Sequence, residues 1–438
     1  MRLVMKALAV AAGSVMVAAG SAAAAPPVLP TPKGKYQKTV QASTLGMHVH
    51  YLTDVAAPQG QRFGAVRIWD NGVRWDQVNP QPGVYDWSAL DRVVANAQAA
   101  GAKEILYVLG STPEWAAKYP SANFSYYYGP GTASVPKSSA IWKNWVRAVA
   151  QRYKGRITAY QPWNEANLTS FFYAGKQNAP VQMAKLTKDM RSVVKSVDPA
   201  AKVTTASSTV IQTKNYVQSS WFADYAKALK KRKVRPDTMS VHLYPWLKKG
   251  PGNGNLKQRE RGLALAKQVM KRNGFAKLPI WDTEMNYGNM RSTAYNKWPK
   301  KKYSQSTGSA YMAQTYLYSL SNGVTQVYWY GWDDFGLGVW PTSKTGRVLQ
   351  PGDTYNNLMT WLAGAKNGGC TPIGSISTCT IKRGGDKQFF VFRSSKAKRM
   401  YTAPKKWKVK EVCTVQGKCK KLKKNGRVKV GLSPLLLK

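Results

Sequence analysis

Residues 157–167 read Ile-Thr-Ala-Tyr-Gln-Pro-Trp-Asn-Glu-Ala-Asn, a short apolar run that ends in an amide beside a carboxylate. The apolar part predicts a buried strand, and the proline and polar residues after it predict a loop. Parallel α/β barrels place functional side chains at this position, the carboxyl end of a strand. Asn164 and Glu165 alone are a weak signal, because a glutamate after a strand is more often a solvated loop residue.

A second stretch strengthens the signal. Residues 278–286 read Leu-Pro-Ile-Trp-Asp-Thr-Glu-Met-Asn, so a predicted buried strand again leads to a carboxylate. The whole chain has only six glutamates, and two of them, Glu165 and Glu284, follow strands in aromatic and uncharged surroundings. We therefore treat the two carboxylates as a candidate pair.

The sequence around these stretches alternates strand-like and helix-like segments. The predicted strands are 44–50, 65–69, 104–109, 157–161, 202–206, 237–244, 278–286 and 325–332. The predicted helices between and after them are 86–100, 138–153, 181–197, 221–231, 256–272, 309–321 and 355–363. Their order and number predict an α/β fold, a (β/α)8 TIM barrel over residues 41–365. Short β-like runs broken by Gly, Lys and Cys predict a small, basic, β-rich domain over residues 366–438.

The start of the chain predicts export. Residues 1–25 combine two early cations, an alanine-rich apolar run and a stretch of small residues, which is typical of a secretory signal peptide. Residues 26–40 are predicted to be a proline-rich linker. No later segment offers a long enough apolar run to span a membrane, so we expect a secreted, extracellular protein without a transmembrane segment. Association with a cell wall is an open alternative to free secretion.

The four cysteines fit that compartment. Cys370 and Cys379 are close in sequence, as are Cys413 and Cys419, and each pair could close a short disulfide loop. A zinc site is the alternative, but it needs tighter cysteine spacing or nearby histidines, and all three histidines lie far upstream. We expect two local disulfides, no metal and no organic cofactor.

The charge is extreme, with 66 Lys and Arg against 20 Asp and Glu, a formal net charge of +46. A positive field of this size attracts polyanions such as an anionic cell envelope or an acidic glycan. It says nothing directly about catalysis, and the alternative explanation is a generally basic proteome or a salt-tolerant surface. We expect no physiological nucleic-acid partner.

Polar and aromatic residues collect at the predicted strand ends, where two carboxylates in different environments could perform glycoside hydrolysis. Opposite charge on Arg67 would keep one carboxylate ionised, although Arg67 could instead pair with Asp70 or Asp282. His48 and His50 alternate along a strand, so one of them should point inward. Tryptophan faces suit the apolar faces of sugar rings. The candidate catalytic residues are Glu165 and Glu284, and the candidate substrate-binding residues are Asn164, Arg67, His48, His242, Tyr244, Trp115, Trp163 and Trp332.

Together these motifs resemble the retaining glycoside hydrolases of clan A. The resemblance rests on Trp163-Asn164-Glu165, Asp282-Thr283-Glu284, His242-Leu243-Tyr244, Arg67 and the segment 75–87. It covers roughly residues 40–365 and is closest to family thirty-nine, with its β-xylosidase, α-L-iduronidase and bacterial exopolysaccharide endoglycosidase relatives.

The resemblance implies a secreted retaining glycoside hydrolase that cleaves a polysaccharide or oligosaccharide by double displacement. Glu165 would be the acid/base and Glu284 the nucleophile. Asn164 would bond the sugar 2-hydroxyl, while Arg67 and Tyr244 would bond the nucleophile. The alternative is a barrel with weak or lost chemistry that serves as an envelope- or polyanion-binding protein, because fold does not guarantee function.

Overall fold

The structure is a computed structural model that describes residues 39–124, 128–210, 212–213, 216–217, 220–245, 255–290, 300–373 and 375–438. In these ranges eight parallel strands form one sheet in the order β5-β4-β3-β2-β1-β10-β9-β8. The strands are β1 (Leu45–Met47), β2 (Ala65–Ile68), β3 (Ile105–Val108), β4 (Ala159–Gln161), β5 (Lys202–Val203), β8 (Met239–His242), β9 (Ile280–Met285) and β10 (Val324–Trp329). A parallel bridge between Thr204 and Thr238 joins the two outer strands, so the sheet closes. The predicted (β/α)8 barrel is confirmed.

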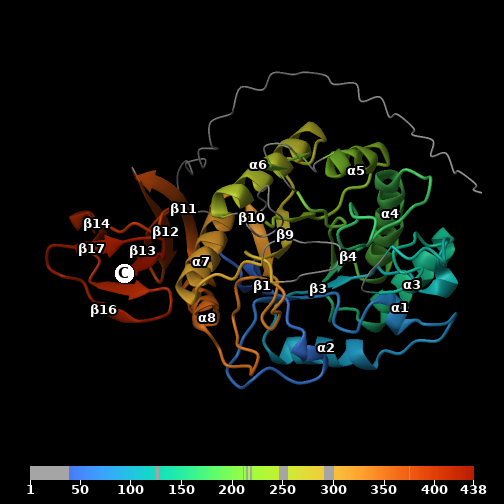
Figure 1. Ribbon diagram of the computed structural model, residues 1–438, viewed down its shortest axis with the longest axis horizontal. Helices are drawn as coiled ribbons and strands as arrows, with labels where there is room; N and C mark the ends of the chain where they lie inside the picture. Colours follow the sequence, from blue (N-terminus) through green and yellow to red (C-terminus); the bar gives the residue numbers. More distant parts are fainter. Residues whose placement is uncertain are drawn as a thin grey trace, which may run out of the picture.

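Helices surround the strands (Figure 1). They are α1 (Trp75–Val78), α2 (Ser88–Ala99), α3 (Ser139–Arg152), α4 (Ala179–Val197), α5 (Ser220–Lys231), α6 (Leu256–Arg272), α7 (Gln305–Ser321) and α8 (Gln350–Leu362). A short antiparallel pair of strands, β6 (Gln212–Thr213) and β7 (Tyr216–Val217), precedes α5. Helices α7 and α8 begin earlier than predicted, because the Ser304 side chain caps α7 and Pro351 is accommodated in the first turn of α8.

The barrel interior contains an apolar layer above the buried Glu104, which accepts hydrogen bonds from Gln326 and Tyr328. Ala65, Leu106, Ala159, Trp281 and Tyr328 pack together there. A Cβ atom at Gly46 would lie 2.6 Å from the Tyr328 ring, so the missing side chain makes room for that ring. Side chains two positions apart in a strand share a face. The residues two positions after Ala65 and Ala159 therefore continue the interior upward, toward the carboxyl ends of the strands.

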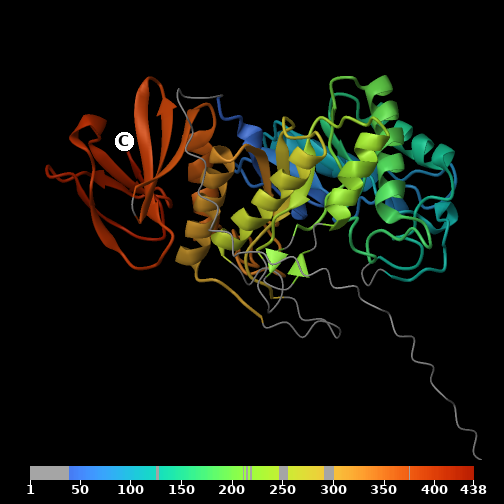
Figure 2. The same cartoon turned by 90° about the horizontal axis from the view of Figure 1, so that it is seen from above.

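The C-terminal region forms a second, antiparallel sheet, as predicted. Its order is β11-β12-β13-β18-β15-β16, and a separate pair is formed by β14 and β17. The strands are β11 (Lys366–Ile373), β12 (Ile376–Arg383), β13 (Asp386–Arg393), β14 (Arg399–Thr402), β15 (Glu411–Thr414), β16 (Cys419–Lys421), β17 (Arg427–Val430) and β18 (Leu435–Leu437). Figure 2 shows this domain beside the barrel, next to the helices that precede it in the chain.

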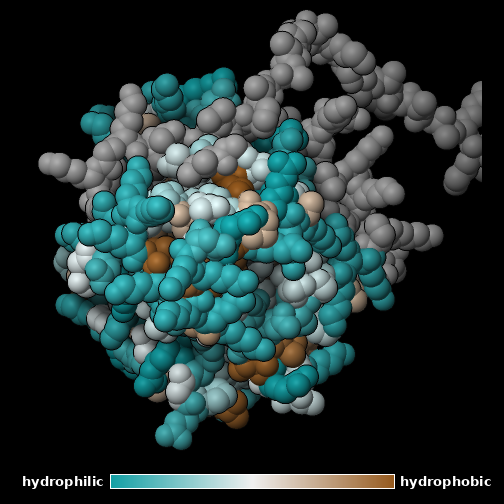
Figure 3. Space-filling model, turned by 90° about the vertical axis from the view of Figure 1, so that its left-hand side faces the viewer, coloured by the Kyte–Doolittle hydropathy of each residue, from teal (hydrophilic) through white to brown (hydrophobic). Residues whose placement is uncertain are grey.

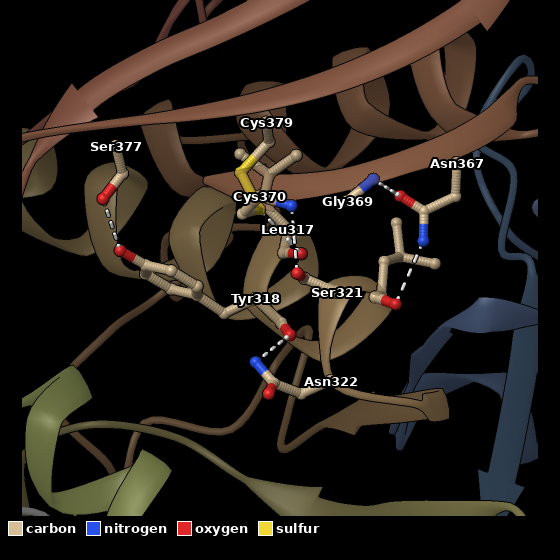
Figure 4. Close-up of a disulfide and its surroundings, with 10 residues drawn as sticks. Leu317, Tyr318, Ser321, Asn322, Asn367, Gly369, Cys370, Ser377 and Cys379 are labelled. Carbon is tan, nitrogen blue, oxygen red and sulfur yellow. Dashed lines mark hydrogen bonds between the residues drawn. A yellow bond between two sulfur atoms is a disulfide. The ribbon is translucent and has the colours of Figure 1, made fainter. Parts of the chain in front are cut away.

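The C-terminal sheet is fixed to helix α7. The Cys370 backbone N–H donates to the Ser321 hydroxyl at 2.9 Å, and the hydroxyls of Tyr318 and Ser377 are 2.9 Å apart (Figure 4). Phe390 and Leu436 belong to the same apolar cluster as the barrel core. Through these contacts the C-terminal sheet packs firmly against the barrel and shares its apolar core.

Both predicted disulfides are confirmed: Cys370 is bonded to Cys379, and Cys413 to Cys419. The predicted signal peptide and most of the predicted linker lie outside the described residues. Among the helices that are described, none is long and apolar enough to cross a bilayer.

Candidate active site

The carboxyl ends of five strands bring the candidate polar residues together. Arg67 is on β2, and His48 directly follows β1. Asn164 and Glu165 follow β4, His242 ends β8 with Tyr244 just beyond it, and Glu284 is near the end of β9. These are the strand ends at which barrel enzymes carry their chemistry.

A β-bulge in β9 turns Glu284 into the barrel. Val241 of β8 pairs with Asp282, but the next residue, His242, pairs with Glu284, so β9 carries one extra residue. Without this bulge Glu284 would share the outward face of Asp282, which bonds to Arg259 of α6 outside the barrel. Bulges are frequent next to active sites because they redirect a side chain.

Glu284 is held by two donors. Arg67 Nη1 donates to its Oε2 at 3.0 Å, and the Tyr244 hydroxyl donates to its Oε1 at 2.7 Å. Burial raises the pKa of Glu284, and the negative charge of Glu165 acts in the same direction. Arg67 and the Tyr244 hydrogen bond oppose this rise, so they favour the ionised carboxylate without restoring its ordinary pKa.

Arg67 is a fully buried hub of hydrogen bonds. Its Nη2 donates to Asn164 Oδ1 at 2.7 Å, and its Nε and Nη2 both donate to Gln161 Oε1, at 3.0 and 2.8 Å. Arg67 does not pair with Asp70 or Asp282, which was the alternative from the sequence. Asp70 pairs with His50, and Asp282 pairs with Arg259. A planar guanidinium with five donors can fix three side chains at once.

Glu165 has an unusual backbone. Its φ angle is +38°, in the left-handed region that non-glycine residues rarely adopt. Its backbone N–H donates to the Ser207 hydroxyl at 2.9 Å, and the N–H of Ala166 donates to the Ser207 carbonyl. Such strain costs about 1–3 kcal/mol and persists where surrounding contacts enforce it, often at functional sites.

His242 lies 2.9 Å from Glu165, measured from its Nδ1 to Oε1. Burial lowers the pKa of His242 to about 3, so the ring is neutral at ordinary pH. Its buried Nε2 has no hydrogen-bond partner among the described residues. A proton on Nε2 would be a buried donor without an acceptor, which is costly. The proton is therefore on Nδ1 and is donated to Glu165.

The two carboxylates lie close together. One oxygen of Glu165, one oxygen of Glu284 and a ring nitrogen of His242 are all within 4.8 Å of one another. Carboxyl groups about 5–5.5 Å apart are typical of retaining glycosidases, whereas inverting enzymes need about 6.5–9.5 Å. The nearest oxygens of the two carboxylates are therefore close enough for the arrangement of a retaining enzyme.

Glu165, Glu284 and His242 form a poor binding site for a metal ion. Arg67 and Tyr244 already donate to the two oxygens of Glu284. A dication between the carboxylates would also face the positive guanidinium, which raises its electrostatic energy.

The two alternating histidines have separate places. His48 is buried, with Nε2 3.2 Å from the Thr283 carbonyl oxygen and 3.3 Å from Arg67 Nη1. Burial and the positive charge of Arg67 lower the pKa of His48 well below its ordinary value. His50 lies nearer the surface, between Asp70 and Asp333, with ring-nitrogen distances of 3.2 and 3.3 Å.

The three candidate tryptophans are not grouped around the carboxylates. Trp163 is fully buried and packs on Trp142 and Phe172. Trp332 packs on core aromatic rings and borders a cleft of about 740 Å³ between loops 51–61 and 332–348. Trp115 is half-buried and donates its Nε1–H to the Asn79 carbonyl.

Sequence reasoning missed several residues of the site. Gln161 was visible only as part of a strand, and Ser207 carried no motif. Tyr330, whose hydroxyl donates to Asp70 Oδ2 at 2.5 Å, was passed over in favour of neighbouring tryptophans. The inward face of β4, read with period two from Ala159, would have identified Gln161.

Comparisons with known proteins show the family and the fold of the chain. Residues 73–320, more than half of the chain, match the family described as glycosyl hydrolases family 39. A family 39 glycoside hydrolase from Bacteroides cellulosilyticus WH2 is similar in structure, with a TM-score of 0.64 and 16% identity over 91% of this chain and 82% of that one.

Two further solved structures share the fold. A glucosidase from Croceicoccus marinus has a TM-score of 0.60 and 13% identity, over 91% of this chain and 96% of that one. A monomeric β-xylosidase from Caulobacter crescentus CB15 has a TM-score of 0.59 and 16% identity, over 86% and 89%. At these identities the likeness concerns the fold alone.

Proposed function

The chain belongs to the glycosyl hydrolases family 39 and is therefore a glycoside hydrolase, and we propose that it is secreted and hydrolyses the glycosidic bonds of polysaccharides with retention of anomeric configuration. Glu165 is the acid/base and Glu284 the nucleophile of a double displacement. The observation that carries this assignment is the short separation of two carboxylates with different partners. Glu284 is bonded by a cation and a phenol, and Glu165 by a neutral imidazole.

In the first step a Glu284 oxygen attacks the anomeric carbon and forms a glycosyl ester. The bond from that carbon to the glycosidic oxygen breaks, and Glu165 gives its proton to the departing oxygen. Arg67 and Tyr244 hold the attacking carboxylate ionised and fix its direction. Proton transfer to the leaving oxygen is needed because an alkoxide is a poor leaving group.

In the second step Glu165 is a carboxylate and accepts a proton from water as the water attacks the same carbon. The ester bond to Glu284 breaks, and two inversions give net retention. The Nδ1–H of His242 suits this step, because it donates to Glu165 and favours the ionised form. Its neutrality avoids a second positive charge beside Arg67.

Asn164 and Arg67 are proposed to position the sugar. The Asn164 oxygen accepts from Arg67, and this orientation leaves the amide nitrogen as the donor toward a sugar hydroxyl. His48 lies beside Arg67, with its Nε2 3.3 Å from Arg67 Nη1, and is proposed to hold the guanidinium in place. Trp115 and Trp332 are proposed to contact more distant sugar units, and Trp332 borders the cleft near the barrel mouth. The role proposed for Trp163 is to support Asn164 and Glu165 through core packing.

The proposed location is extracellular. The predicted signal peptide and the two disulfides both favour an exported protein. The net charge of +46 supports attachment to an anionic envelope or acidic glycan.

The test is turnover on a panel of plant and envelope polysaccharides and of aryl glycosides. Wild type should hydrolyse at least one substrate, and Glu165→Gln and Glu284→Gln should each lose most of that activity. Glu114→Gln, an exposed glutamate after β3, is the matched control and should stay active. Equal activity in Glu284→Gln and wild type would contradict the assignment. No turnover on any substrate would favour the binding-protein alternative.

A further inference from the structure

The C-terminal domain contains a groove at the edge of its main sheet. The groove lies between strand β16, which ends the six-stranded sheet, and the β14–β17 pair, and its volume is about 670 Å³. It is not formed by the barrel, and none of the candidate active-site residues lines it. The groove is therefore a second concave feature of the described structure, separate from the carboxylates.

The walls of the groove are strongly basic. Six cations line it: Lys418, Lys420, Lys421, Lys423, Arg427 and Lys429. All six are exposed, and among the described residues none of them forms an ion pair with a carboxylate. No acidic residue lines the described groove. Six unneutralised cations around one concavity focus a positive potential that attracts an anion with several charges.

The scaffold holds these charges in place. The disulfide from Cys413 to Cys419 ties the edge strand β16 to β15. In β17 exposed and buried residues alternate, so Arg427 and Lys429 point to the same exposed side, about 6.6 Å apart along the strand. This spacing is of the order of one sugar unit or slightly more, which suits a chain that carries acid groups at regular intervals.

The floor of the groove is apolar. Val412 and Val428 line it and also belong to the apolar cluster inside the domain, so the floor is rigid. Met400, which is half exposed, adds to it. None of the described lining residues is aromatic, so the groove lacks the stacking platforms on which single-stranded nucleic acids bind. Val412 and Val428 are nearly buried, so a flat lipid surface would gain little apolar contact from them.

From these features we infer that this groove binds a linear acidic polysaccharide whose carboxylate groups face the six cations. The preference for a polysaccharide over other polyanions rests on the proposed function, whereas the preference for an anionic chain rests on the groove itself. The site takes no part in the cleavage reaction and holds the enzyme on a glycan.

The position of the groove suits such attachment. Strands β14, β16 and β17 lie at the end of the molecule away from the barrel (Figure 1). The face at that end is mostly hydrophilic with small apolar patches (Figure 3). A glycan held there leaves the carboxylates of the barrel unobstructed.

The experiment measures the affinity of the full-length protein for polygalacturonate by calorimetry. The probes for comparison are a neutral glucan of similar length, phosphatidylglycerol vesicles and single-stranded DNA. We expect polygalacturonate to bind, and its affinity to fall by about a hundredfold between 50 and 500 mM salt if about three contacts are engaged. The neutral glucan should not bind the groove.

Two triple variants with the same charge change identify the surface. Lys420→Gln, Lys423→Gln and Arg427→Gln together remove groove cations and should weaken polygalacturonate binding at least about tenfold. Lys396→Gln, Lys405→Gln and Lys406→Gln remove three exposed cations of the same domain that do not line the groove. This variant should change the affinity for polygalacturonate less than about threefold. Equal weakening in both variants would overturn the inference, since diffuse charge would then explain the binding.

Two other results would also overturn it. If the DNA or the vesicles bound the groove more tightly than polygalacturonate, an acidic polysaccharide would not be its preferred ligand. If the neutral glucan bound as tightly as polygalacturonate, charge would not determine the binding. Calorimetric binding does not require catalysis, so loss of groove binding and loss of hydrolysis are separate outcomes. The groove variant should hydrolyse a small aryl glycoside as fast as wild type.

Discussion

The Tyr244→Phe substitution tests how the candidate nucleophile is kept ionised. The Tyr244 hydroxyl donates to Glu284 Oε1 at 2.7 Å, and burial raises the pKa of Tyr244 well above its ordinary value, so the hydroxyl stays a donor. Phenylalanine keeps the ring and removes only the hydroxyl. A hydrogen bond to a charged group contributes about 1.5–3 kcal/mol.

This energy predicts a shift in pH dependence. One pKa unit corresponds to about 1.4 kcal/mol, so losing the bond should raise the pKa of Glu284 by about one to two units. Burial already raises the pKa of Glu284, and the nucleophile must be ionised to attack. Activity is therefore lost as pH falls through this pKa, and the acid limb of the variant should move to higher pH by about one to two units.

The assay is kcat/KM against pH on an aryl glycoside that the wild type hydrolyses. Loss of activity should be largest on the acid side and smaller at higher pH, where Glu284 is ionised in both proteins. Tyr107→Phe is the control, because its buried hydroxyl donates to the Val73 carbonyl and not to a carboxylate. An acid limb that stays in place in Tyr244→Phe, or shifts equally in Tyr107→Phe, would refute the reasoning.

Three further predictions concern stability. Arg259→Met leaves Asp282 buried without its cation, and should lower the free energy of unfolding in urea by about 3–5 kcal/mol, because both side chains are fully buried. Replacing Cys413 and Cys419 by serine opens a short loop and should lower the free energy of unfolding by about 2 kcal/mol. The variant should therefore melt at a lower temperature than oxidised wild type, and the difference should disappear when this disulfide of the wild type is reduced. Although burial lowers the pKa of His50, hydrogen bonds to two carboxylates raise it well above 6.5. The stabilisation by His50 is therefore complete below pH 6.5 and lost as pH rises through the raised pKa, so the stability gap between wild type and His50→Gln should shrink in alkali.

The barrel could be predicted from the sequence because its signals agree. Apolar strands alternate with amphipathic helices in the right order, and the two glutamates stand out because glutamate is scarce. The C-terminal strands were predicted less completely. Strand β11 contains two glycines and a proline, which mask its pattern, and the proline is tolerated because β11 is at the sheet edge.

The details of the site depend on backbone geometry that periodicity does not contain. The bulge in β9 decides that Glu284 faces the interior while Asp282 faces α6. The positive φ of Glu165 is likewise invisible in sequence. Tryptophans near strand ends pack in protein cores as readily as they bind sugars. Trp163 is a core residue that packs against Trp142 and Phe172.

The most direct test of the central claim is to trap the covalent intermediate. An activated aryl glycoside that wild type hydrolyses is mixed with Glu165→Gln, in which the second step lacks its base, and the protein is analysed by intact and peptide mass spectrometry. A sugar adduct on the peptide containing Glu284, absent from Glu165→Gln/Glu284→Gln, is the result that we predict. An adduct on another residue, or no adduct together with an inverted product by NMR, would contradict the double displacement proposed for Glu165 and Glu284.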